Sequence, residues 1–144
     1  MYKLLIASNQ KPWRLHVKDL LLPYEFNVCG EAQNFDETLL LSELHLPNII
    51  LFNFKYALRE QLALISSISQ LGTSVKILVF SPNPIRRSTW SYIRAGACAL
   101  LQPDTNDDEF ISVVRGSLAG YTLAPFNRLS EPNPKVARRK YGPP

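Results

Sequence analysis

Residues 46–54, Leu-Pro-Asn-Ile-Ile-Leu-Phe-Asn-Phe, form the stretch that decides the fold of this chain. The run Asn48–Phe52 is apolar after its first residue and is followed by the polar Asn53, which is typical of a strand covered on both faces in a parallel sheet. Similar runs occur at Leu4–Ala7 and Lys76–Phe80, and weaker strand patterns occur at Phe26–Glu31 and Ala97–Leu101. The sequence therefore predicts five strands, of which this stretch is the third.

Apolar residues recur at helical spacing after each of these strands, and two of the intervals open with a helix-start signal. Asn34 with Glu37 forms one signal, and Thr105–Asp108 forms the other, as a capping box with acidic residues in the first turn. Alternating strands and helices predict an α/β fold with a doubly wound parallel sheet, (βα)5. The helical positions and ranges are Trp13, Val17, Leu20 and Leu21 before Pro23; Leu40, Leu41 and Leu44; Leu58–Leu71; Ile85–Ala95; and Phe110, Val113, Val114 and Leu118 before Gly120.

The net charge of +4 is located at the C-terminal end of the chain. Residues 1–124 hold 11 basic and 11 acidic residues, whereas residues 125–144 hold five basic residues and one acidic residue. A neutral body is no evidence for a nucleic-acid-binding surface. Prolines and basic residues replace the apolar periodicity near the end, so we expect one domain over residues 1–123 and a basic, proline-rich irregular tail or linker over residues 124–144.

Size and composition exclude several classes of protein. A chain of 144 residues fits one domain, and no stretch approaches the roughly 20 apolar residues that span a bilayer. The run Leu4–Ala7 is too short for the core of a signal peptide, so we expect a cytoplasmic protein without membrane insertion. Cys29 and Cys98 are too few for a metal site or a disulfide framework, and we interpret them as small buried thiols.

Polar residues follow the predicted strands at the edge where an open parallel sheet places its functional site. They are Ser8 and Asn9 after the first strand, Asn53 after the third, Ser81 after the fourth, and Gln102 and Pro103 after the fifth.

In the order and spacing of these features, residues 2–123 resemble the receiver domain of bacterial two-component response regulators, particularly those of the NarL type. The matching stretches are KLLIASNQ (3–10), LPNIILFNF (46–54), VKILVFS (75–81) and IRAGACALL (93–101). The resemblance implies a flavodoxin-like (βα)5 sheet with strand order 2-1-3-4-5.

The departures from this family matter as much as the matches. A receiver holds Mg²⁺ with an acidic pair and an acceptor aspartate, and it balances the phosphoryl charge with a lysine. The resemblance places Ser8 and Asn9 at the acidic pair and Asn53 at the acceptor. The lysine position falls on Pro103, or on Gln102 with one gap, and only the hydroxyl position remains, as Ser81. We therefore expect a degenerate pseudo-receiver with no enzyme activity, metal or cofactor.

Three other interpretations of these residues stay open. The chain could be a different flavodoxin-like domain with a coincidental alignment. Asn53 and Ser81 could close a hydrogen-bonded polar lid over the sheet, which is compatible with a pseudo-receiver. The crevice at this edge of the sheet, which lacks the acidic residues of the family, could bind a small ligand. His16 and His45 have no cysteine or second histidine at metal-ligand spacing, and His45 near a helix end can complement the helix dipole.

The predicted fourth helix carries a candidate partner surface. If Ile85, Thr89, Tyr92 and Ile93 face the sheet, then Arg86, Trp90 and Arg94 form an outer stripe of residue types enriched at binding hot spots. Leu100 occupies the position of the family's switch aromatic in the fifth strand, and we assign it to the same partner surface. The alternative is that Trp90 lies in the core and the arginines are solvated.

Taken together, the sequence favours a phosphorylation-independent pseudo-receiver that acts as a regulatory protein–protein interaction module. Its partner would be another protein, or a second copy through the fourth helix, fifth strand and fifth helix. One alternative is the regulatory domain of a transcription regulator whose helix-turn-helix part is absent from this chain. Another is a small-molecule sensor that uses the crevice. DNA binding would need such an output domain or the tail, whose Arg138, Arg139, Lys140 and Tyr141 we expect to meet an acidic protein surface in preference to nucleic acid.

Overall fold

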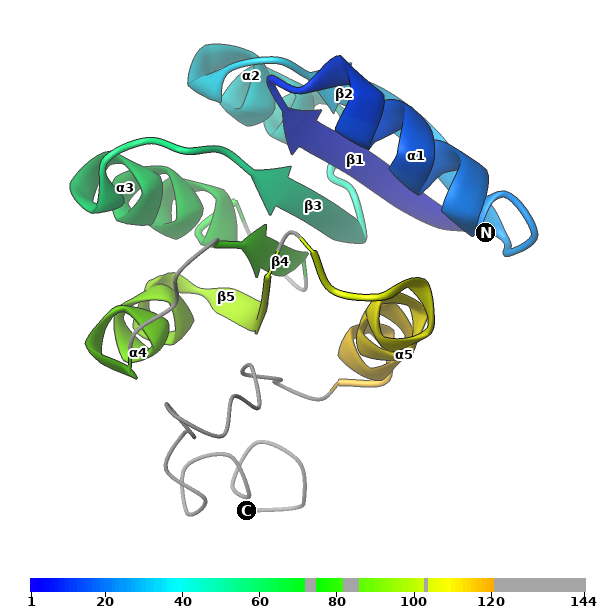
Figure 1. Cartoon of the computed structure of the whole chain (residues 1–144). Coiled ribbons are helices and arrows are strands. Elements are labelled where there is room, and N and C mark those ends of the chain that lie inside the picture. The colour runs from blue at the N-terminus through cyan, green and yellow to red at the C-terminus, as the bar shows by residue number, and fades with distance from the viewer. Residues whose placement is uncertain (72–74, 82–85, 103, 121–144) are drawn as a thin grey trace.

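A computed structural model describes residues 1–71, 75–81, 86–102 and 104–120, with only the backbone of residues 86–88. Five parallel strands form one sheet in the order β2-β1-β3-β4-β5, and a helix follows each strand (Figure 1). The predicted flavodoxin-like (βα)5 fold is therefore confirmed. The elements are β1 Tyr2–Ser8, α1 Lys11–Leu21, β2 Phe26–Ala32, α2 Phe35–His45, β3 Ile49–Asn53, α3 Leu58–Ser69, β4 Lys76–Phe80, α4 Arg86–Ala95, β5 Ala97–Leu101 and α5 Asp107–Leu118.

The strands at the centre of the sheet are apolar on both faces because helices cover both (Figure 1). Leu5 and Ile50 point to the face covered by α2, α3 and α4, whereas Leu4 and Ile49 point to the face covered by α1 and α5. All five residues of β3 are buried, as the quoted stretch predicts. Burial of both faces fixes the sheet as the middle layer of three, so its carboxyl edge is the place where loops can build a site.

Helix α2 forms where expected but with a different buried face. Leu40 and Leu44, predicted to lie on its apolar stripe, are 61% and 69% exposed, and Leu41 is only partly buried. Thr38 and Ser42 are buried instead. Each hydroxyl donates a hydrogen bond to the backbone carbonyl one turn earlier in the helix. Thr38 Oγ1 donates to the Asn34 carbonyl at 2.7 Å, and Ser42 Oγ donates to the Thr38 carbonyl at 2.6 Å. Burial of these small residues is possible because no hydroxyl loses its partner.

The two predicted helix-start signals have different outcomes. Asn34 caps α2 by accepting a hydrogen bond from the Glu37 amide at 2.8 Å, as predicted. The cap of α5 is Asn106 and not Thr105, because Asn106 Oδ1 accepts from the Glu109 amide at 2.8 Å. The Thr105 hydroxyl instead donates to the Gln102 carbonyl at 2.6 Å and closes the turn after β5.

A tight contact sets the position of α4 against α3. Gly96 follows α4 with a φ of 128°, and a Cβ atom there would lie 2.6 Å from the Cβ of Ser69. Ser69 Oγ also donates to the Ala95 carbonyl at 3.1 Å. Only glycine fits this approach, so the glycine of the IRAGACALL stretch holds the end of α3 against the turn between α4 and β5.

The cysteines lie far apart, on β2 and β5 at opposite edges of the sheet, and both are free. Cys98 is buried as predicted, whereas Cys29 is only partly buried. Burial raises the pKa of both thiols. No helix in the described part of the chain is long and apolar enough to cross a membrane.

Candidate functional site

The carboxyl ends of β1 and β3 bring Ser8 and Asn53 together. The two residues are register partners at the end of the parallel pair, and they are 0% and 3% exposed. Asn9 is exposed. Gln102 is partly buried, and its backbone amide donates to Thr105 Oγ1 at 3.2 Å. Four of the predicted positions thus lie along one edge of the sheet together with Ser81, whose amide donates to the Leu101 carbonyl at 2.8 Å. Pro103 lies outside the described residues.

Arg14 is a buried residue of this edge that the sequence analysis missed. Its side chain is only 8% exposed, and its Nη1 donates to the Ser8 carbonyl at 2.6 Å. Its Nε donates to Glu31 Oε1 at 3.0 Å, and Lys18 Nζ donates to the other oxygen of Glu31 at 2.7 Å. The hydrogen bond from Lys18, with that from Arg14, lowers the pKa of Glu31. Arg14 could have been found from the sequence, because it lies three residues before Val17 and therefore on the buried face of the predicted first helix.

This set of groups does not fit Mg²⁺. The ion prefers anionic oxygens in octahedral geometry, whereas the strand ends carry the hydroxyl of Ser8 and the amide of Asn53, with the guanidinium of Arg14 from α1 bonded to the Ser8 carbonyl. The nearby carboxylate, Glu31, is already bonded to Arg14 and Lys18. Within the described residues, no group of three or more His, Cys, Asp or Glu side chains is placed to hold a metal ion.

The side-chain nitrogen of Asn53 takes no part in the hydrogen-bonded lid that was one interpretation of Asn53 and Ser81. Among the described residues, Asn53 Nδ2 is buried and has no hydrogen-bond partner. Ser81 acts on Tyr92, a residue of α4 that is 3% exposed: burial raises the pKa of Tyr92, and the Ser81 side chain partly offsets this rise. The edge therefore presents a buried amide donor in place of a carboxylate acceptor.

Gln61 joins Tyr92 in α4 to the loop after β3 through two hydrogen bonds. The Tyr92 hydroxyl donates to Gln61 Oε1 in α3 at 2.9 Å, and Gln61 Nε2 donates to the Tyr56 carbonyl at 2.6 Å. Burial raises the pKa of Tyr92. The aromatic hydroxyl beside Ser81 thus comes from α4 and not from β5. Leu100 in β5 is 2% exposed and packs in the core, so its assignment to a partner surface was wrong.

The orientation of α4 agrees with the predicted one. Thr89 and Tyr92 are buried and Ile93 is partly buried, while Arg94 is exposed. Trp90 is partly buried, between the two predicted alternatives. The side chain of Arg86, residue Ile85 and the tail residues Arg138, Arg139, Lys140 and Tyr141 lie outside the described residues.

The two histidines have local partners. His16 Nε2 lies 3.2 Å from Asp107 Oδ1, which links α1 to the first turn of α5, and both side chains are more than half exposed. His45 ends α2, as predicted, and its carbonyl accepts from Lys3 Nζ at 3.2 Å.

The chain has a sequence relative among transcription regulators. No family model matches it. It is 26% identical over 129 residues to a protein named as a positive transcription regulator of virulence factors, BvgA, from Bordetella pertussis. The match covers 90% of this chain and 62% of that protein, so the chain spans less than two thirds of the relative's length.

The fold is shared with solved receiver domains. The signal receiver domain of the response regulator NarL from Mycobacterium tuberculosis matches with a TM-score of 0.74 and 19% identity, over 83% of this chain and 97% of that chain. A response regulator from Burkholderia pseudomallei, solved with a phosphorylated aspartic acid, a calcium ion and citrate, matches with a TM-score of 0.68 and 17% identity, over 83% and 69%. At these identities the likeness concerns the fold, and it supports the resemblance to receiver domains that the sequence indicated.

Proposed function

We propose that this chain is a phosphorylation-independent pseudo-receiver, a regulatory module that binds partners without accepting a phosphoryl group. The observation that supports this most strongly is the pairing of Ser8 with Asn53 at the end of the central strands, with the Arg14 guanidinium bonded to the Ser8 carbonyl. A hydroxyl, an amide and a fixed cation occupy the edge at which a receiver gathers carboxylates.

The chemistry of phosphoryl transfer supports the same proposal. The Burkholderia response regulator carries its phosphoryl group on an aspartic acid. Asn53 offers an amide, which is a poor nucleophile and brings no negative charge to attract a metal ion. The guanidinium of Arg14 repels a divalent cation, and Glu31 is neutralised by Arg14 and Lys18. In the part of the chain that the structure describes, the strand ends therefore lack the carboxylates that would serve as nucleophile and metal ligands, which supports the proposal.

Output from such a module would pass through its surface, and α4 is the surface we assign to a partner protein or a second copy of the chain. Arg94 is exposed there and Trp90 is partly buried beside it. Tyr92 ties the inner face of the same helix to Gln61, whose side-chain amide donates to the Tyr56 carbonyl. The helix is thus connected to the loop between β3 and α3, while Arg94 is exposed on its outer face. We expect the protein to act in the cytoplasm.

A second candidate function is the regulatory domain of a transcription regulator. The Bordetella relative is named as a transcription regulator, and the match covers 62% of its length. In that case the DNA-binding part would belong to a longer protein, and the pseudo-receiver would control it through contacts made by α4.

A phosphorylation assay tests the first proposal. The full chain is incubated with acetyl phosphate and Mg²⁺, and its intact mass and amide NMR spectrum are recorded. We expect no gain of a phosphoryl group and no Mg²⁺-dependent shifts at Ser8 or Asn53. A variant with Ser8→Asp, Asn9→Asp and Asn53→Asp serves as the comparison, since it restores the carboxylates. A Mg²⁺-dependent mass gain in the natural chain would refute the proposal.

A further inference from the structure

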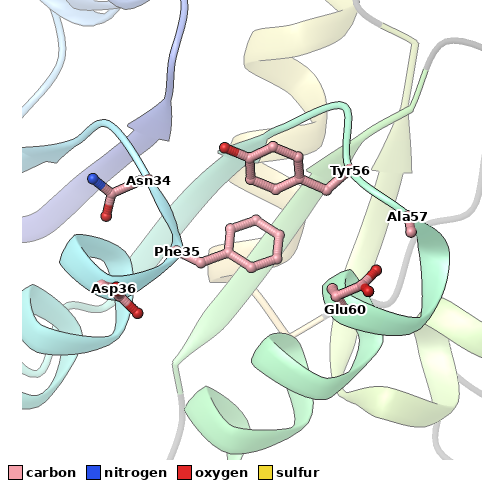
Figure 2. Close-up of a pocket in the computed structure, with 6 residues that line it drawn as sticks. All are labelled: Asn34, Phe35, Asp36, Tyr56, Ala57 and Glu60. Carbon is pink, nitrogen blue, oxygen red and sulfur yellow. The ribbon is translucent and has the colours of Figure 1, made fainter.

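A pocket of about 490 Å³ lies between the first turns of α2 and α3, at the carboxyl side of the sheet (Figure 2). Its lining residues are Asn34, Phe35, Asp36, Tyr56, Ala57 and Glu60. This volume is within the range of small-molecule and peptide side-chain sites. None of these residues belongs to the degenerate phosphorylation site.

The wall of the pocket is built from packed aromatic rings. The rings of Phe35 and Tyr56 meet edge to face with centroids 4.6 Å apart, and Tyr56 lies parallel to Phe54 at 5.7 Å. Phe54 is 1% exposed and contacts the buried Phe52, whereas Tyr56 is 45% exposed. The core thus anchors an aromatic cluster whose outermost ring is left open to solvent.

The backbone of Tyr56 is also held in place. Its carbonyl accepts a 2.6 Å hydrogen bond from Gln61 Nε2, and Gln61 is 5% exposed with its oxygen bonded to Tyr92. A loop fixed by a buried amide loses little freedom when a ligand binds. The ordering cost that usually reduces affinity is therefore small at this ring.

Two carboxylates flank the rings. Figure 2 shows Asp36 on the α2 side and Glu60 on the α3 side of Phe35, each in the first turn of its helix. A helix N-terminus carries only about half a positive charge, so the two negative charges of Asp36 and Glu60 exceed the combined positive charge of the two helix ends. The neighbouring cations Lys55 and Arg59 are exposed and do not line the pocket. The pocket therefore combines aromatic surface with net negative charge.

We propose that this pocket binds a guanidinium group, such as the side chain of an arginine carried on a peptide. Guanidinium ions stack on aromatic faces and form paired hydrogen bonds with carboxylates, so the two lining chemistries suit one ligand. The volume exceeds that of the cationic group alone, which leaves room for the aliphatic stem against Phe35 and Tyr56. The site goes beyond the proposed function and does not depend on it.

The arginine has two possible sources: a separate peptide, or the chain's own residues Arg138 and Arg139, which belong to a stretch with five basic residues and one acidic residue. Both present the same group to the pocket. The experiment therefore measures the chemistry first and distinguishes the sources in a separate arm.

The first arm titrates the ¹⁵N-labelled full chain with Nα-acetyl-arginine amide and, in parallel, with Nα-acetyl-citrulline amide, its neutral counterpart. We expect saturable amide shifts at Phe35, Tyr56 and Glu60, with a dissociation constant on the order of 1 mM for so small a ligand. The citrulline compound should bind at least tenfold more weakly. Equal binding of the two compounds, or no shift at these residues, would overturn the proposal. So would saturable shifts at the pocket with inorganic phosphate alone, since the helix ends would then dominate.

The second arm uses variants of the full chain. Glu60→Gln and Tyr56→Leu should each weaken arginine binding severalfold, whereas Glu43→Gln, which removes an exposed α2 carboxylate outside the pocket, should leave it unchanged. If Glu60→Gln and Glu43→Gln behave alike, the pocket carboxylate is not a ligand and the proposal fails. In an Arg138→Gln, Arg139→Gln variant, tighter binding of the arginine amide would support the site and identify the tail as its natural occupant. Unchanged binding would support a separate peptide.

Discussion

The hydroxyl of Tyr92 in α4 donates a 2.9 Å hydrogen bond to the side-chain oxygen of Gln61 in α3, and both residues are at least 95% buried. The bond joins two neighbouring helices on one face of the sheet, and Gln61 Nε2 donates a further hydrogen bond to the Tyr56 carbonyl. The proposed partner surface on α4 and the pocket residue Tyr56 are thus connected by hydrogen bonds through the buried side chains of Tyr92 and Gln61.

Replacing Tyr92 with phenylalanine should destabilise the domain by about 1–3 kcal/mol, because Gln61 Oε1 is left buried without its donor. Urea unfolding of the full chain measures the change. Tyr2→Phe is the matched control, since Tyr2 is 47% exposed at the start of β1 and should change stability by less than about 0.5 kcal/mol. Equal effects of the two variants would mean that the bond contributes nothing.

Glu31 should make the stability depend on acid pH. Its folded pKa is below the ordinary value of 4.5, first because Lys18 donates to it and then because Arg14 does. A lowered folded pKa means that the ionised form stabilises the fold above about pH 4.5 and that this contribution is lost as the pH falls through the folded pKa. Urea midpoints measured between pH 6 and pH 2.5 should fall less steeply for Glu31→Gln than for the natural chain. A Glu43→Gln control should retain the natural slope.

Gly96 should tolerate alanine much less well than Gly120. Both have positive φ values, 128° and 102°, but an added Cβ meets Ser69 at 2.6 Å in the first case and nothing within 4 Å in the second. The difference between Gly96→Ala and Gly120→Ala therefore isolates the steric contact, which should cost about 1–3 kcal/mol more. Thermal or urea unfolding of the two variants measures it. Equal losses of stability in the two variants would show that the end of α3 shifts to accommodate the methyl group.

Trp90→Ala should weaken association with a partner or with a second copy by about 2 kcal/mol or more if Trp90 is an anchor of the α4 surface. Sedimentation across a concentration series and pull-down from the native cell measure this, with circular dichroism as the check on folding. Leu44→Ala removes an exposed apolar side chain from α2 and should leave association unchanged. Unfolding of the Trp90 variant would instead assign the ring to the core.

The sequence by itself determined the fold and the placement of Ser8 and Asn53, in place of carboxylates, at the ends of the central strands. Continuous apolar runs require helices on both faces, and parallel strands end at one edge, so Ser8 and Asn53 had to lie near each other. The phase of α2 was not predictable, because its leucines lie on every side and its buried positions are filled by Thr38 and Ser42. Hydroxyl groups that bond to their own helix carry no signature of burial in the sequence.

Only the tertiary structure decided which side chains meet across elements. Arg14 and Glu31 are 17 residues apart, and Gln61 and Tyr92 are 31 apart, and nothing local to either residue marks its partner. The aromatic pocket likewise joins Phe35, at the start of α2, to Tyr56, in the loop between β3 and α3. Periodicity reports the environment of one residue along its own helix or strand, whereas a hydrogen bond or ring contact between elements depends on how the helices pack on the sheet.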